Sequence, residues 1–76
     1  MTYEYRSDEG LIRLVQVGGW WRLEYGGARK GNWPSASAAV AAVSRHASGL
    51  EAWDELGDTV EASEDLLDWT PLGENL

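Results

Sequence analysis

The acidic residues in the last third of the chain are the first candidates for chemistry. Glu64, Asp65 and Asp68 lie close together in the sequence, and two carboxylates at a suitable separation can act as general acid and general base. No second polar partner and no substrate anchor accompany them, so the pattern is more typical of a solvated helix face. His46, the single histidine, is expected to pack or to cap a helix rather than to act as a base or a ligand. We therefore predict that the protein is not an enzyme and has no catalytic residue.

The same acids do not form a recognisable metal-binding loop. An EF-hand loop that starts at Asp54 needs an oxygen ligand at its third position and Gly at its sixth, but Leu56 and Thr59 stand there. The Gly pairs at 18–19 and 26–27 are expected to shape hairpin turns, because no helix N-terminus follows them to hold a phosphate. The chain also has no Cys to supply a thiolate ligand. We expect neither a metal site nor a cofactor.

Charge is divided unevenly along the chain. Residues 1–49 contain six basic and four acidic side chains, whereas residues 50–76 contain nine acidic side chains and no basic one, which gives the formal net charge of −7. A block of one sign raises a negative potential that attracts basic protein surfaces and repels nucleic acid. We therefore expect a protein partner, and no direct binding of DNA or RNA.

Apolar residues are mixed into this acidic block. The stretch LEAWDELGDTVEASEDLLDW, residues 50–69, holds eight carboxylates together with two Trp residues, so it must dock on a surface. One interpretation is that Trp53 and Trp69 dock it on the chain's own sheet, over the face that carries Trp20. Its acids would then face solvent or pair with basic residues of the first half, namely Arg6, Arg13, Arg22 or Arg29.

The other interpretation leaves an aromatic surface partly open beside a negative rim, for a partner to cover. The two interpretations are compatible, because a docked segment still exposes some of its carboxylates. The residues predicted to bind a partner are Trp20, Asp54, Glu55, Asp58, Glu61, Glu64, Asp65 and Asp68.

The elements that position these residues begin with a sheet over residues 1–33. Alternating residues from Tyr3, a turn at 7–10 and the branched run 11–17 predict a hairpin, and residues 20–25 and 28–33 continue it as a meander. In this register Trp21 faces the core, and we predict that it is buried under the helix with Val40 and Val43. Trp20 then points to the opposite side of the sheet.

A helix is predicted over residues 35–48. Ser35 is its expected N-cap and Gly49 occupies the expected C′ position. Residues 50–76 follow as an acidic docking segment with a short helix that starts near Asp58 or near Ser63. Pro71 ends that helix, and LGENL, residues 72–76, is expected to be a loose end.

Together these features predict a single small α+β domain over residues 1–76. An antiparallel sheet of three or four strands is packed by one main helix, and the acidic segment follows. A chain of 76 residues buries only about 60% of its unfolded surface, so each large side chain matters for stability. We find neither a secretion signal nor a membrane span, and expect a cytoplasmic protein without membrane contact.

One stretch carries a resemblance. Gly31, Trp33, Ser35 and Ala39 form a G-x-W-x-S-x-x-x-A run, which His46, Gly49, Trp53 and the Leu-Leu-Asp-Trp of residues 66–69 follow. In these residues the chain resembles short uncharacterised bacterial and phage reading frames in which a small antiparallel sheet precedes one Ala-rich helix. The resemblance implies a fold and no activity. The chain is similar to anti-CRISPR proteins in size and acidity only.

Two functions of different kinds remain open from the sequence. The first is a small non-enzymatic interaction protein, of the kind that phages or prophages use as inhibitors, which occupies a basic, nucleic-acid-binding surface of a host protein. The second is a structural or accessory domain that binds through its sheet edge or through the Trp20 face.

Overall fold

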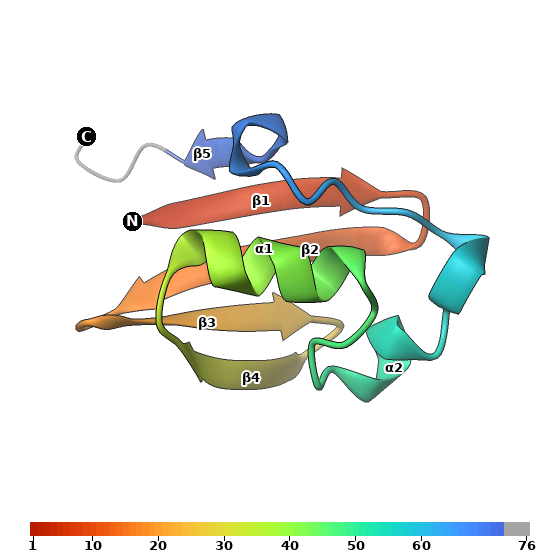
Figure 1. Ribbon diagram of the computed structural model, residues 1–76, viewed down its shortest axis with the longest axis horizontal. Coiled ribbons are helices and arrows are strands. Elements are labelled where there is room, and N and C mark those ends of the chain that lie inside the picture. The colour runs from red at the N-terminus through yellow and green to blue at the C-terminus, as the bar shows by residue number, and fades with distance from the viewer. Residues whose placement is uncertain (73–76) are drawn as a thin grey trace.

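A computed structural model, which describes residues 1–72, has a five-stranded antiparallel sheet with one main helix across one face (Figure 1). Four strands form a meander: β1 (Thr2–Ser7), β2 (Gly10–Val17), β3 (Trp20–Tyr25) and β4 (Ala28–Trp33). A short last strand, β5 (Thr70–Leu72), pairs with β1, so that the order across the sheet is β4-β3-β2-β1-β5. The α+β class agrees with the prediction, and the fifth strand exceeds the three or four that were predicted.

Tight turns set the register of the meander. The turn between β3 and β4 consists of Gly26 and Gly27, which have φ angles of 56° and 86°. Two consecutive positive φ angles are typical of the type I′ hairpin turn, whose twist matches that of the strands. This turn places Tyr25 opposite Ala28 and Glu24 opposite Arg29. Successive side chains of β1, β2 and β3 therefore alternate between the helix-covered face and the other face, and a register shift in β4 interrupts the alternation there.

The main helix, α1 (Ala36–Ser44), begins as predicted and ends early. The Ser35 hydroxyl caps it by accepting a hydrogen bond of 3.1 Å from the Ala38 N–H. At its other end His46 has a φ of 53°, and the N–H groups of His46 and Ala47 return to the carbonyls of Val43 and Ala42. This is a Schellman motif with His in the place usually taken by Gly. The prediction that the helix reaches residue 48 and stops at Gly49 is therefore wrong.

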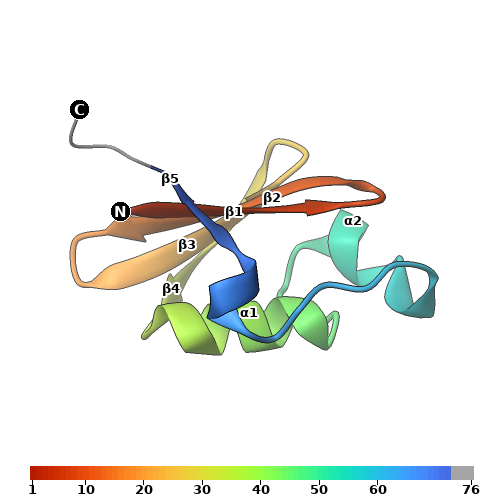
Figure 2. The same ribbon diagram turned by 90° about the horizontal axis from the view of Figure 1, so that it is seen from above.

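The acidic segment then crosses one end of the sheet and returns along β1 (Figure 2). It contains a short helix, α2 (Glu51–Asp54), and two 3₁₀ turns, η1 (Gly57–Thr59) and η2 (Leu66–Asp68). Neither predicted helix start is an N-cap, because η1 follows Leu56 and the cap of η2 is Asp65. Of the predicted loose end, Leu72 belongs to β5, and residues 73–76 lie outside the described part of the chain.

The core lies between the sheet and α1, and two tryptophans of the acidic segment complete it. Trp53 and Trp69 are buried on the same side as α1, together with apolar residues of the sheet and helix that include Ile12, Leu14, Leu23, Val40 and Val43. The prediction that these two rings cover the Trp20 face is therefore wrong. Ala side chains leave room beside the helix, so the rings fit on the face that α1 already covers.

Trp21 faces the core as predicted but lies at its rim. It is only half-buried, and its ring centroid lies 6.0 Å from that of Tyr3. The reason is its position near the end of β3, where it is paired with the exposed Gln16, whereas Leu23 occupies the centre of the strand and is fully buried. The prediction that Trp21 packs between the sheet and the helix with Val40 and Val43 is correct in its face, although the ring is not fully buried.

The helices within residues 1–72 are short, and none has the length and apolar character needed to span a bilayer.

Candidate protein-binding surfaces

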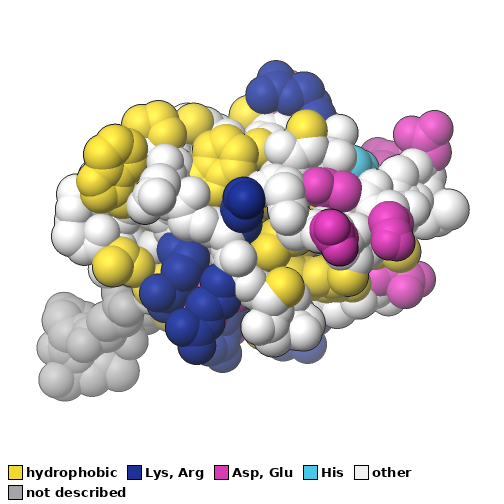
Figure 3. All heavy atoms as spheres, turned by 90° about the horizontal axis from the view of Figure 1, so that it is seen from below, with side chains coloured by type: hydrophobic (Ala, Val, Ile, Leu, Met, Phe, Trp, Pro, Cys, Tyr) yellow, Lys and Arg dark blue, Asp and Glu magenta, His cyan; other side chains and the backbone are white. Residues whose placement is uncertain are grey.

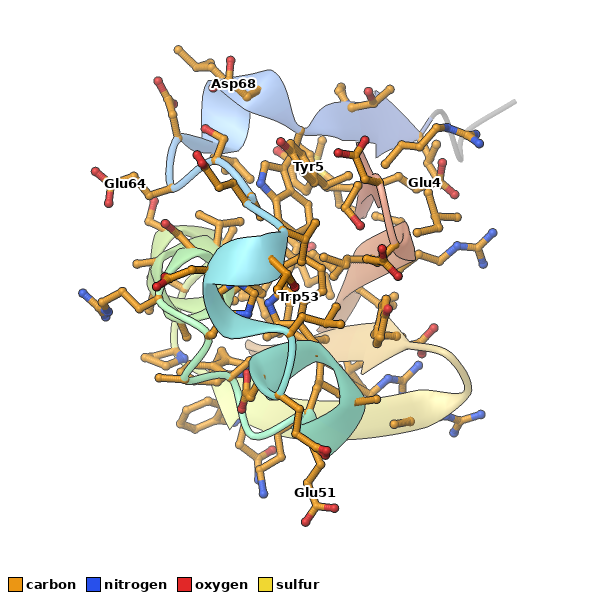
Figure 4. All side chains as sticks on the ribbon, turned by 90° about the vertical axis from the view of Figure 1, so that its right-hand side faces the viewer. Glu4, Tyr5, Glu51, Trp53, Glu64 and Asp68 are labelled. Atoms are coloured by element: carbon orange, nitrogen blue, oxygen red, sulfur yellow. The ribbon has the colours of Figure 1, made fainter. Side chains whose placement is uncertain are left out.

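Carboxylates from the acidic segment form a belt at one end of the molecule. Figure 4 shows the segment running across that end, with Glu51, Glu64 and Asp68 pointing outward at different heights. We define the acidic belt as the exposed carboxylates of this segment: Glu51, Glu55, Asp58, Glu61, Glu64, Asp65 and Asp68. All except Glu51 belong to the predicted set, and the structure distributes them over the whole end of the sheet rather than in one cluster.

The backbone under the belt is fixed by buried contacts. Trp53 is fully buried, and its Nε1–H donates a hydrogen bond of 2.9 Å to the Val43 carbonyl. Val60 and Ala62 are also buried, and the Trp69 Nε1–H donates to the Ser63 carbonyl at 3.2 Å. The carboxylates therefore project from a segment whose apolar side chains belong to the domain core.

His46 connects the end of α1 to two points of the acidic segment. Its Nδ1 lies 3.0 Å from the Trp53 carbonyl oxygen and its Nε2 lies 2.9 Å from the Val60 carbonyl oxygen. Its ring also stacks on the Trp53 indole, with centroids 4.7 Å apart and planes 12° from parallel. Which of the two nitrogens donates depends on the tautomer of the ring. The role of His46 in this structure is to hold the segment in place.

Asp54 differs from the other predicted binding residues. One of its carboxylate oxygens accepts hydrogen bonds from the backbone N–H and the hydroxyl of Ser48, at 3.0 and 2.8 Å. The other accepts from the Gly49 N–H at 2.8 Å. Ser48 is almost completely buried, so Asp54 satisfies donors in the loop between α1 and α2. We therefore assign Asp54 a structural role and leave it out of the belt.

Two belt residues also have local bonds. Asp65 accepts a hydrogen bond from the Leu67 N–H as the N-cap of η2, and Asp68 accepts one from the Ser63 hydroxyl. Both remain exposed, so each keeps carboxylate surface that faces solvent.

Ion pairs do not join the belt to the basic half of the chain. Within residues 1–72 the ion pairs of the sheet are internal to it: Arg13 with Glu4 at 3.1 Å, and Arg22 with Glu24 at 2.8 Å. The expected pairing of the segment with these arginines is therefore wrong, because it docks on the opposite face of the sheet. Charge stays segregated, and Figure 3 shows basic and acidic side chains gathered in separate parts of one surface.

The turn between β1 and β2 adds two acids that were not among the predicted binding residues. Asp8 and Glu9 are exposed, and the turn lies at the same end of the molecule as α2 and η1 (Figures 1 and 2). Their distance in sequence from the acidic block concealed this proximity. The hairpin itself was predicted. That its tip lies beside the acidic segment could not be predicted, because the path of that segment was not known.

The second surface is the face of the sheet that no other element of residues 1–72 covers, which we call the open face. Trp20 is 53% exposed there and Val17, its partner in the β2–β3 register, is 47% exposed. The predicted position of Trp20 on the far side of the sheet is thus confirmed, whereas Val17 was not among the predicted binding residues. Alternation along β2 places Val17 on the open face, together with Leu11, Arg13 and Val15.

Comparison of the chain with protein-family models, with curated proteins and with solved structures finds no match. The resemblance to short bacterial and phage reading frames therefore rests on the quoted residues alone. Within the described residues, no group of three or more His, Asp or Glu side chains is placed to hold a metal ion.

Proposed function

We propose that the protein acts by binding another protein, and that the acidic belt contacts a basic surface of that partner. The observation that supports this function is the state of the seven belt carboxylates, which are exposed and form no ion pair with the described residues. Their negative charge is therefore not neutralised within the chain. Asp8 and Glu9 reinforce it at the same end.

The fixed backbone of the belt supports the same proposal. Binding through a disordered acidic tail would lose ordering entropy on association, whereas Trp53, Val60, Ala62 and Trp69 already hold this segment on the core. Rim charges of this kind act mainly by steering diffusional encounter, which raises association rates by about 10- to 1,000-fold. The belt is thus suited to fast binding of a cationic surface.

A basic protein surface often serves to bind nucleic acid. A rigid negative array would compete with DNA or RNA for such a surface, so we include in the proposal a partner that binds nucleic acid at the same place. Inhibition of a host protein by a phage protein is one setting in which this competition would be useful. The proposal excludes direct binding of nucleic acid by the belt, because both carry negative charge.

The test uses a variant that removes charge and keeps the fold. Glu51→Gln, Glu55→Gln, Asp58→Asn and Glu61→Gln together neutralise four belt residues and leave Asp54 intact. A partner is first isolated with the wild-type protein from host lysate and identified by mass spectrometry. Stopped-flow measurement should then show association slowed by about tenfold or more in the variant at low salt, and a wild-type rate that falls as salt rises.

A matched control keeps the charge at the same positions. Glu51→Asp, Glu55→Asp, Asp58→Glu and Glu61→Asp change the side chains while preserving all four negative charges. This variant should associate at nearly the wild-type rate. Equal rates for the neutralised variant and the wild type, with no salt dependence and no competition by nucleic acid, would reject the belt as the binding surface.

A second candidate function is an accessory domain that binds through the open face. The exposed Trp20 and Val17 favour it, because a large aromatic ring beside a branched apolar side chain is typical of the centre of protein interfaces. This surface lies on the other side of the sheet from α1, so the two candidate functions can be tested separately.

A further inference from the structure

The open face has two shallow hollows, one at each end of β3. The first is lined by Leu11, Arg13, Glu24 and Arg29 and by the turn at residues 26–27. The second, at the other end of the strand, is lined mainly by Val17, Trp20, Arg22, Gly31 and Asn32. The first hollow therefore includes two arginines beside Glu24, and the second includes Trp20 and Val17 beside Arg22.

Arg29 is the cation of the first hollow that forms no ion pair with any described residue. Arg13 already pairs with Glu4, and Glu24 pairs with Arg22 rather than with Arg29, although Glu24 and Arg29 are opposite each other in the register. Within residues 1–72 Arg29 forms no ion pair, and it is exposed. Its guanidinium can therefore donate two hydrogen bonds to a carboxylate of a partner without breaking an ion pair inside the chain.

The backbone of β4 is open at the same place. β4 is an edge strand, and a two-residue hairpin turn makes Tyr25 and Ala28 the hydrogen-bonded closing pair. Because the pattern alternates in an antiparallel ladder, the N–H and C=O of the next residue, Arg29, point away from β3 toward solvent. An extended chain lying along β4 could form hydrogen bonds with the N–H and C=O of Arg29 and an ion pair with its guanidinium.

The spacing of the hollows sets the spacing of the residues that could fill them. Trp20 and Glu24, which mark the two hollows on β3, are four residues apart. At about 3.3 Å per residue this is about 13 Å, which an extended chain also spans in four residues. Residues at i and i+4 of a strand project from the same face, so one strand can fill both hollows.

We propose that the open face binds an extended segment of a partner protein in which an acidic residue and a large apolar residue are four positions apart. The carboxylate pairs with Arg29, the apolar side chain packs on Trp20 and Val17, and the segment runs along the β4 edge. This inference deepens the second candidate function and is independent of the acidic belt. Charge complementarity selects the occupant, because the unpaired group in the hollow is a cation.

A second copy of this chain is a poorer occupant. Pairing two β4 strands edge to edge would bring Arg29 and Lys30 of both copies close together, and like charges on facing strands are unfavourable. Basic side chains on an edge strand also suppress such self-pairing in general. The same charges attract an acidic strand.

The experiment selects ligands from a display library of random 12-residue peptides on the immobilised full-length protein. We expect the selected peptides to share an Asp or Glu and a Trp, Phe, Leu or Ile at a spacing of four. Synthetic copies should lose about fivefold or more in affinity for the Arg29→Gln and Trp20→Ser variants. Circular dichroism should show both variants folded, because the two side chains are exposed.

Two matched controls come from the same chain. Lys30→Gln removes the same charge from the same strand, but Lys30 belongs to the other side of β4, where its side chain lies against Gly49. Leu67→Ser removes an apolar side chain that is 90% exposed on η2, away from the open face. Affinity for both controls should stay within about twofold of wild type, since rim substitutions outside a contact are nearly neutral.

The other outcomes overturn the inference in distinguishable ways. Binding that needs Trp20 but not Arg29 would overturn the acidic occupant and keep the open face as a binding surface. Basic peptides that depend on the acidic belt would overturn it in favour of the first function. Failure to select any peptide, or an equal loss of affinity in Lys30→Gln, would overturn the docking of a strand on this face.

Discussion

Replacement of Trp53 by Ala should remove most of the stability of the domain. Trp53 is 0% exposed, donates a hydrogen bond to the Val43 carbonyl, stacks on His46 and meets the Tyr25 ring edge-on with centroids 5.5 Å apart. A buried Trp removes about 150 to 250 Å² from water, which at about 25 cal/mol per Å² corresponds to roughly 4 to 6 kcal/mol. Because Ala retains part of this burial, we expect Trp53→Ala to lower the free energy of unfolding by about 3 to 5 kcal/mol.

The size of the domain makes this loss easy to detect. A chain of 76 residues has a free energy of unfolding of roughly 4 to 11 kcal/mol, at about 0.05 to 0.15 kcal/mol per residue. Urea denaturation followed by far-ultraviolet circular dichroism measures the change without relying on tryptophan fluorescence. Trp20→Ala is the matched control, and its free energy of unfolding should change by less than about 1 kcal/mol because Trp20 is 53% exposed.

The two tryptophans would respond alike if the acidic segment were not docked on the core. A free energy of unfolding for Trp53→Ala within about 1 kcal/mol of the Trp20→Ala value would refute the placement of Trp53 beside α1. The belt would then lose its fixed backbone. This comparison therefore tests the fold and the basis of the proposed function together.

Three further predictions concern the same segment. His46→Ala should lower the free energy of unfolding by about 2 to 3 kcal/mol in a denaturant titration, and His46→Gly by about 1 kcal/mol less, because Gly adopts the φ of 53° without strain. Equal losses would argue against backbone strain at this position. Asp54→Ala should lower the free energy of unfolding by about 1 to 3 kcal/mol, because three donors of Ser48 and Gly49 lose their acceptor. Glu55→Ala should change it by less than about 0.5 kcal/mol in the same titration. In amide exchange followed by NMR, the backbone N–H groups of Trp53 and Trp69 should be protected, since both donate within the fold; exchange at the rate of an unfolded peptide would indicate a tail that orders only on a partner.

The meander could be predicted from the sequence because its signals are local. Gly26 and Gly27 determine the hairpin turn, and the alternation from Trp20 to Tyr25 determines which side chains share a face. Ser35 likewise marks the start of α1 through its own hydroxyl. In each case the residue type that indicates the element also forms the turn or the cap itself.

The end of α1 and the fifth strand depend on distant contacts. Gly49 is the better residue for a helix stop by propensity, but the ring of His46 gains contacts with Trp53 and Val60 that offset its left-handed backbone. β5 has only three residues and includes Pro71, so nothing in its own sequence predicts a strand. It forms because β1 offers a free edge.

The same difference between local signals and distant contacts explains which parts of the candidate surfaces could be predicted. The exposure of Trp20 follows from strand alternation, whereas the side on which Trp53 and Trp69 dock depends on the space left beside the alanines of α1. Both faces of the sheet carry a large ring near β3, and the prediction chose the Trp20 face, which is the wrong one. The structural role of Asp54 also required knowing that Ser48 is buried.

The pairing of β5 with β1 has a consequence for the order of folding. Thr2 is paired with Leu72, so this last contact joins residues from nearly opposite ends of the chain, whereas every other strand pair is closed by a short hairpin. Contacts of large sequence separation form slowly, because closing a long loop costs entropy before any contact is gained. During synthesis the meander and α1 would emerge first, with Ile12, Leu14 and Leu23 still lacking the two rings that later cover them. We therefore expect the nascent chain to gain protease resistance only after Trp69 and β5 have left the ribosome.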